Sequence, residues 1–164
     1  FEPIDYEQFC GMPILDPSSI EETRAEVNRL LEEQGKALLD RVGLDDRGLP
    51  PGYALKDDVE ITPRDLKRRL DAGESITIVD CRAPQERDIC KLDDQFAIPL
   101  EQVSGRGHEL NEFKDRPVVA YCRVGTRSIQ FAKLLRQQGY TDVKSLAGGI
   151  VLWNSDVNPG GVTY

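Results

Sequence analysis

Residues 118–135 read VVAYCRVGTRSIQFAKLL, and this stretch determines the predicted fold. Its first four residues form an apolar run typical of a buried strand, and the residues from Ser128 onward place apolar side chains at helical spacing. Cys122 stands at the turn between the two patterns, with Gly125 inside the turn. The stretch therefore predicts a strand, a short loop that begins with a cysteine, and a helix.

A cysteine in such a loop can be a nucleophile if its thiol is ionised, because only the thiolate attacks and a free thiol of pKa about 8.5 is mostly protonated at neutral pH. Backbone N–H groups of a loop that curls around the sulfur, together with the positive end of the following helix, would stabilise the anion. Gly125 permits the turn that this requires, and Arg123 and Arg127 add fixed positive charge. Taken alone, Cys122 could also be an inert residue at the end of a buried strand.

Strand and helix patterns alternate on both sides of this stretch, from residue 58 onward. We expect strands at 59–61, 75–81, 96–100, 117–121 and 143–146, and helices at 64–72, 103–113 and 128–138. Such alternation predicts an α/β fold, in which helices flank a parallel sheet on both faces. The carboxyl ends of parallel strands form the functional crevice in these folds, and both the segment 80–82 and Cys122 fall at such ends.

The first third of the chain differs in composition. Residues 1–57 hold 13 acidic and 6 basic residues, whereas residues 58–164 are nearly balanced. A capping box at Ser18 and Glu21 precedes an amphipathic pattern that predicts a helix over about 19–42. The Gly- and Pro-containing residues 43–56 have the composition of a linker. We therefore expect an acidic extension over 1–57, with one helix and a linker, followed by a domain over 58–164.

Composition also excludes several function classes. The net charge of -8 argues against a nucleic-acid partner, which would require a basic surface. No apolar segment has the length of a membrane helix and no signal peptide is apparent, so we expect no membrane association and a cytoplasmic protein. The four cysteines, Cys10, Cys81, Cys90 and Cys122, lack metal-ligand spacing, and His108 is the only histidine. We therefore expect neither a metal nor another cofactor.

Four motifs between residues 58 and 158 together resemble those of the rhodanese-like sulfurtransferase domains. They are Asp80-Cys81-Arg82 followed by Glu86, the segment 97–100, the loop 122–127, and the segment 148–153. The resemblance implies a rhodanese-like sheet and a persulfide carried on Cys122 as the catalytic residue. It also implies that the substrate-binding loop consists of Arg123, Val124, Gly125, Thr126, Arg127 and Ser128. Cys81 stands where the family usually has Val.

Three residues of the first motif have a supporting role in this interpretation. We expect Asp80, Arg82 and Glu86 to form an ion-paired network that fixes the loop from beneath, rather than to act as acid–base groups. Arg127 has two interpretations, since it could bind an anionic sulfur donor or tie the loop down.

A narrower likeness concerns the segments 5–11 and 88–92 and the terminal Tyr164. They are similar to the C-terminal part of adenylyltransferase-sulfurtransferases, which serve molybdopterin, thiamine or thiolated-tRNA synthesis. This likeness implies two partners, a ubiquitin-fold sulfur-carrier protein and an adenylating domain. The chain itself has no Gly-x-Gly-x-x-Gly loop and no Cys-x-x-Cys pair, so we expect the adenylating half to be absent from it.

The sequence thus predicts a sulfurtransferase. Sulfur would pass from a donor, such as thiosulfate or a protein persulfide, through a Cys122 persulfide to an acceptor. One alternative is a phosphatase of the related cysteine-loop type, in which five residues separate the cysteine from the arginine. Here four residues separate Cys122 from Arg127, which makes a smaller loop that suits a sulfur atom. The other alternative is a non-catalytic docking module.

Overall fold

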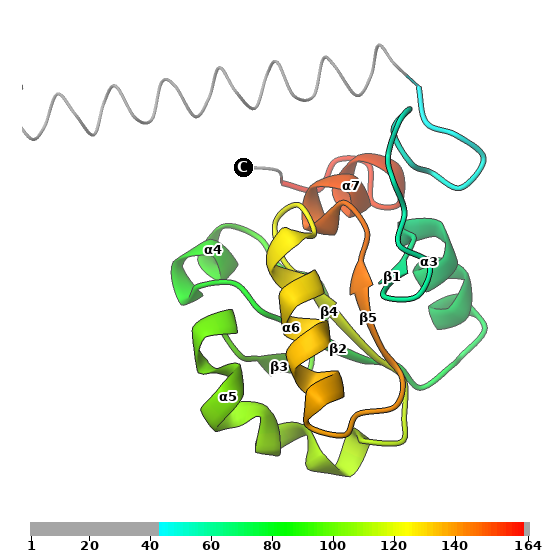
Figure 1. Cartoon of the computed structure of the whole chain (residues 1–164). Coiled ribbons are helices and arrows are strands. Elements are labelled where there is room, and N and C mark those ends of the chain that lie inside the picture. Colours follow the sequence, from blue (N-terminus) through cyan, green and yellow to red (C-terminus); the bar gives the residue numbers. More distant parts are fainter. Residues whose placement is uncertain (1–42, 163–164) are drawn as a thin grey trace, which may run out of the picture. The chain divides into compact units, whose positions relative to one another are not determined.

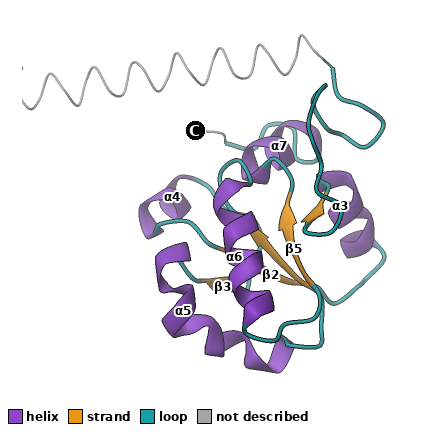
Figure 2. Cartoon of the chain, in the orientation of Figure 1, coloured by secondary structure: helices purple, strands orange, loops and turns teal. Residues whose placement is uncertain are grey.

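A parallel five-stranded sheet is the centre of the fold (Figures 1 and 2). The computed structural model describes residues 43–162. In these residues the strands pair in the order β1-β5-β4-β2-β3, and every pair is parallel. The strands are β1 Glu60–Ile61, β2 Thr77–Asp80, β3 Phe96–Ala97, β4 Val118–Tyr121 and β5 Val143–Leu146. The predicted α/β class is confirmed.

The burial of the central strands agrees with their position in the sheet. Every residue of β2 and β4 is buried, which is expected for central strands of a parallel sheet that is covered on both faces. The strands β1 and β3 have two residues each and lie at the edges. Cys81 and Cys122 directly follow β2 and β4, so both lie at the same edge of the sheet.

Helices cover both faces of the sheet, as predicted (Figure 1). One face packs against α5 and α6, and the other against α3 and α7. The helices are α3 Pro63–Asp71, α4 Pro84–Ile89, α5 Val103–Arg106, α6 Thr126–Gln137 and α7 Gly149–Asp156, with 3-10 helices η1 Leu100–Gln102 and η2 Gly107–Phe113. Thr62 caps α3, since its side chain accepts a hydrogen bond from the N–H of Asp65.

One predicted helix was wrong in part, and two helices were missed. The helix expected over 103–113 is α5 followed by the 3-10 helix η2. The helix α4 was missed because its six residues include no buried side chain and therefore no apolar stripe. The helix α7 was missed because the glycine pair at 148–149, which begins it, reads as a turn.

Residues 44–55, here called the N-terminal strap, pack onto the domain. Leu49 is fully buried against Ala147 and Leu152. The Arg64 side chain donates hydrogen bonds to the backbone carbonyls of Asp45 and Asp46. This part of the expected linker is therefore packed rather than free, because its apolar side chains find a surface beside α7.

The other N-terminal expectations lie outside the described residues. These are the capping box at Ser18 and Glu21 and the helix over about 19–42, and the division of the chain at residues 57 and 58 stays a prediction. Within 43–162, no helix is long and apolar enough to span a membrane.

Candidate active site

The loop that joins β4 to α6 surrounds the sulfur of Cys122. The strand ends at Tyr121 and the helix begins at Thr126, two residues earlier than predicted. Gly125 adopts a φ of 101°, a conformation that favours glycine, and this turns its N–H toward the sulfur. The Gly125 nitrogen lies 3.1 Å from Cys122 Sγ. The loop thus directs the N–H of Gly125 at the sulfur, as the prediction of a cradle requires.

The environment of Cys122 favours the thiolate. The residue is fully buried, and its pKa is lowered to about 5. The largest cause is a hydrogen bond from the side chain of Cys81, followed by bonds from the side chain and N–H of Ser128 and from the N–H of Gly125, while burial opposes them. At pH 7 a thiol of pKa 5 is about 99% ionised.

The N-terminus of α7 holds the loop from the outside. The N–H of Ile150 donates to the carbonyl of Cys122 at 2.9 Å, and the N–H of Val151 donates to the carbonyl of Arg123 at 3.2 Å. Both carbonyls are therefore bound by the first turn of α7 and are directed away from the sulfur. This approach requires Gly149, whose φ is 59° and whose missing Cβ would lie 2.5 Å from the Cys122 carbonyl oxygen.

Two serines lie beneath the sulfur. Ser128 Oγ is 3.5 Å from Cys122 Sγ and 2.8 Å from Ser145 Oγ. Both serines are fully buried, and Ser128 also donates to the Gly125 carbonyl at 3.1 Å. Ser145, on β5, was missed by the sequence analysis. The signal that could have found it is a small polar residue at a buried position of the strand.

Arg127 is paired with Glu86. Two guanidinium nitrogens lie 2.6 Å from the two carboxylate oxygens of Glu86, and this pairing raises the pKa of Arg127. Glu86 also accepts a hydrogen bond from the N–H of Ala83, ahead of α4. Because this bidentate bond joins the loop to α4, it favours the interpretation of Arg127 as the residue that ties the loop down.

Asp80 and Arg82 form a fully buried ion pair. Arg82 donates to both oxygens of Asp80, at 2.9 and 2.7 Å, and to the carbonyl of Cys90 at 2.7 Å. The hydroxyl of Tyr121 and the guanidinium of Arg87 also donate to Asp80. Arg82 also donates to the backbone carbonyl of Glu86 at 3.4 Å, so the three expected supporting residues lie next to one another.

The other residues proposed for the loop lie at its surface. Arg123, Val124 and Thr126 are exposed, and Arg127 is half-buried. The loop therefore presents side chains of Arg, Val and Thr to an approaching molecule, while Cys122, Gly125 and Ser128 are buried.

A residue outside the predicted domain also contacts the site. The hydroxyl of Tyr53, in the N-terminal strap, donates to Glu60 at 2.7 Å and accepts from the N–H of Gly148 at 3.1 Å. Glu60 is buried, so the pair fixes the residue that precedes α7. No signal in the sequence pointed to Tyr53, because it lies in a segment with a linker composition.

The other cysteines and the histidine do not form a metal site in the described residues. Among residues 43–162, no group of three or more His, Cys, Asp or Glu side chains could hold a metal ion. Cys81 is buried beside Cys122, whereas Cys90 is partly buried at the end of α4. His108 is exposed, and Cys10 lies outside the described residues.

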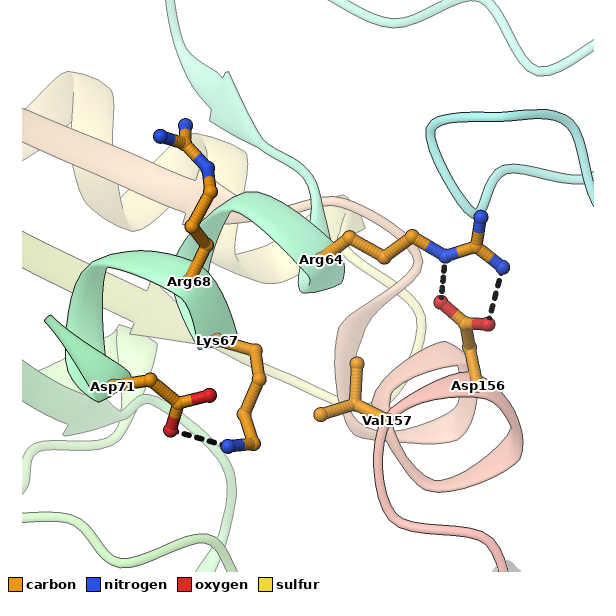
Figure 3. Close-up of a pocket in the computed structure, with 6 residues that line it drawn as sticks. All are labelled: Arg64, Lys67, Arg68, Asp71, Asp156 and Val157. Carbon is orange, nitrogen blue, oxygen red and sulfur yellow. Dashed lines mark hydrogen bonds and ion pairs between the residues drawn. The ribbon is translucent and has the colours of Figure 1, made fainter.

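A pocket of about 420 Å³ lies between α3 and α7 (Figure 3). Its lining includes Arg64, which forms a bidentate pair with Asp156 at 2.8 and 2.7 Å, and Lys67, which is paired with Asp71. In Figure 3 the Arg64–Asp156 pair joins α3 to α7 across the pocket, and the Lys67–Asp71 pair lies along α3. The pocket is therefore an ion-paired seam between two helices and is not part of the Cys122 loop.

Comparison with known proteins assigns the family. The model of the rhodanese-like domain matches residues 62–156. The chain is 40% identical over 94 residues to the protein named "Sulfurtransferase" of Allochromatium vinosum, and the match covers 57% of this chain and 86% of that protein. The solution structure of the rhodanese-like domain of Anabaena Alr3790 has a TM-score of 0.54 and 29% identity, covering 58% of this chain and 73% of that one.

A second relative is longer. The protein named "Probable adenylyltransferase/sulfurtransferase MoeZ" of Mycobacterium tuberculosis is 36% identical over 105 residues, which are 63% of this chain. The matched part is 26% of MoeZ, so the chain corresponds to about a quarter of that relative. The family match and the cysteine loop agree, and the chain belongs to the rhodanese-like domain family.

Proposed function

We propose that the protein is a sulfurtransferase that carries sulfane sulfur as a persulfide on Cys122. The observation that supports this most strongly is the position of the Cys122 sulfur, which receives the N–H of Gly125 at 3.1 Å within a loop of only four intervening residues. Membership of the rhodanese-like family and two relatives whose names include "sulfurtransferase" agree with it.

In the first half of the reaction, the Cys122 thiolate attacks the sulfane sulfur of a donor. With thiosulfate, a new S–S bond forms at Cys122 while the S–S bond of the donor breaks, and sulfite leaves with the electron pair. The terminal sulfur of the resulting persulfide is anionic near neutral pH. The N–H of Gly125, the hydroxyl of Ser128 and the N-terminus of α6 are suited to stabilise this charge.

In the second half, an acceptor takes the terminal sulfur. A small thiol or cyanide would attack the outer sulfur and return Cys122 to the thiolate. With an acyl-adenylated carrier protein, the persulfide would attack the acyl carbon and AMP would leave. A thiol would then attack the Cys122 sulfur of the resulting acyl disulfide, and the S–S bond would break to release the carrier as a thiocarboxylate. We propose a ubiquitin-fold sulfur carrier and an adenylating domain as partners, because the relative MoeZ is named as both an adenylyltransferase and a sulfurtransferase. A cytoplasmic location stays a prediction.

Intact mass spectrometry tests the proposal. After incubation with thiosulfate and removal of the excess, the protein should gain the mass of about one sulfur atom, and a dithiol should remove it. Cys122→Ala should abolish the gain. Cys90→Ala is the matched control, because Cys90 lies outside the loop and its loss should leave the gain unchanged.

The same preparation separates the alternatives. Hydrolysis of an aryl phosphate without sulfur uptake would indicate the phosphatase alternative and refute the proposal. Absence of both activities, together with carrier thiolation that Cys122→Ala does not change, would leave only a docking role.

A further inference from the structure

Cys81 and Cys122 lie side by side at the same edge of the sheet. Parallel pairing sets Asp80 opposite Tyr121 at the ends of β2 and β4, and the next N–H, that of Cys81, donates to the Tyr121 carbonyl at 3.0 Å. Cys81 and Cys122 are 1% and 0% exposed and belong to the same buried cluster, on the face covered by α5 and α6. Two thiols are therefore adjacent in the interior of the site.

The single proton of the Cys81 thiol has two potential acceptors. Its Sγ donates to the Tyr121 carbonyl oxygen at 3.2 Å, and the Cys122 side chain belongs to the same buried cluster. An ionised sulfur is a stronger acceptor than a neutral carbonyl, because the bond is then assisted by charge. Rotation about the Cβ–Sγ bond lets the proton turn from the carbonyl to the Cys122 sulfur when the latter is ionised.

The surroundings of the pair determine which of the two thiols keeps its proton. The hydrogen bond to Cys122, burial, and the negative charges of Cys122 and Asp80 raise the pKa of Cys81, whereas Arg127 opposes them. Cys122 has in addition the donors of Gly125 and Ser128. Cys122 is therefore the thiol of the pair that ionises more readily.

The charged or titratable groups around the pair are those already described. They are Asp80 after β2, Arg127 on α6 and Tyr53 of the N-terminal strap. The hydroxyl of Tyr53 has a raised pKa because of burial and its bond to Glu60, so it stays neutral over the range in which Cys122 titrates.

We propose that Cys81 is a positioning residue of the site, whose thiol stays protonated and donates a hydrogen bond to the ionised sulfur of Cys122. This rests on the proposed function, in which Cys122 is the sulfur carrier. The consequence for the reaction is that Cys81 raises the fraction of attacking thiolate and holds the sulfur in one direction. Cys81 itself, being protonated, does not attack the persulfide, so sulfur is retained on Cys122 until an acceptor arrives.

The test compares two replacements of Cys81. Cys81→Val removes the donor and keeps the size and apolar character of the side chain, whereas Cys81→Ser keeps a donor. The measurement is the titration of the Cys122 thiolate, followed by its ultraviolet absorbance between about pH 4 and 10 and corrected by the spectrum of Cys122→Ala. Urea unfolding of each variant verifies that it is folded, and Cys81→Ala is measured if Val does not fold.

We expect the midpoint of the Cys122 titration to rise by about 1–2 pH units in Cys81→Val, as for the loss of one charge-assisted hydrogen bond. In Cys81→Ser the midpoint should lie close to that of the natural protein. The rate of persulfide formation in the Val variant should fall about tenfold or more below the new midpoint and should approach that of the natural protein at alkaline pH. A merely structural role would lower the rate at every pH.

An unchanged midpoint in a folded Val variant overturns the proposal, and so does a Ser variant that titrates like Val. The proposed function and the role of Cys81 can be refuted independently of each other. A protein that takes no sulfur refutes the proposed function whatever Cys81 does. A protein that takes sulfur on Cys122, but whose titration does not depend on Cys81, refutes only the role of Cys81.

Discussion

Substitution of Gly149 by alanine should loosen the cysteine loop and destabilise the fold. A Cβ at this position would lie 2.5 Å from the Cys122 carbonyl oxygen and closer still to the carbonyl of Arg123. Both contacts are with backbone atoms, which cannot move aside as a flexible side chain can. The first turn of α7 would have to withdraw, and the hydrogen bonds from Ile150 and Val151 to the loop would be stretched or lost.

The size of the effect can be worked out by comparison with Gly73→Ala. Gly73 also has a positive φ, of 78°, but a Cβ there would meet no atom within 4 Å. Backbone strain of about 1–2 kcal/mol is therefore common to both variants. Overpacking adds about 1–3 kcal/mol to Gly149→Ala, and the loss of two hydrogen bonds adds about 1–3 kcal/mol more. The expected difference between the two variants is about 2–6 kcal/mol.

Urea unfolding followed by circular dichroism provides the free energy of unfolding of both variants. The titration of Cys122 provides a second measurement, since a displaced loop no longer directs the Gly125 N–H at the sulfur, and the midpoint should rise only in Gly149→Ala. If the two glycine variants differ by less than about 1 kcal/mol and titrate alike, the argument that α7 holds the loop is wrong.

Three further predictions concern the site and its supports. Because the pKa of Cys122 is depressed to about 5, its contribution to stability is absent below that pH, grows by at most about 1.4 kcal/mol per pH unit, and is complete above about 8.5. The difference in unfolding free energy between the natural protein and Cys122→Ser should therefore increase with pH, and a difference independent of pH would contradict the depressed value. Tyr53→Phe should lower the unfolding free energy by about 1–3 kcal/mol, since its hydroxyl both donates and accepts in a partly buried place; a neutral result would mean that the strap does not support the site. Arg82→Met should cost about 3–5 kcal/mol by leaving the buried Asp80 without its bidentate partner. In the same assay Arg106→Met, which breaks a partly exposed pair, should cost less than about 1 kcal/mol.

The sequence was sufficient for the sheet and the cysteine loop. Central parallel strands must be apolar on both faces, so the segments that became β2 and β4 were visible as short apolar runs. The loop was visible because a cysteine, a glycine and two arginines occur together between a strand and a helix, an arrangement that has few structural alternatives.

The parts that could not be predicted depend on contacts between distant residues. The glycine pair before α7 reads as a turn, and only the packing of α7 against the loop shows that a helix begins there. The same holds for Ser145 of β5, which contacts Ser128 of α6, and for Tyr53, which contacts Gly148 from a segment of linker composition. Local patterns contain no information on such pairs.

The N-terminal strap has a consequence for where this domain can be cut. The rhodanese-like family match begins at residue 62, whereas the packed unit includes the edge strand β1 and Tyr53. A fragment trimmed to the family boundaries would lose the strand that pairs with β5 and the hydroxyl that holds Gly148. Similarity thus marks the part of the domain that is shared with relatives. Expressed fragments or domain swaps should instead begin ahead of Leu44, which packs against the cluster around Leu49.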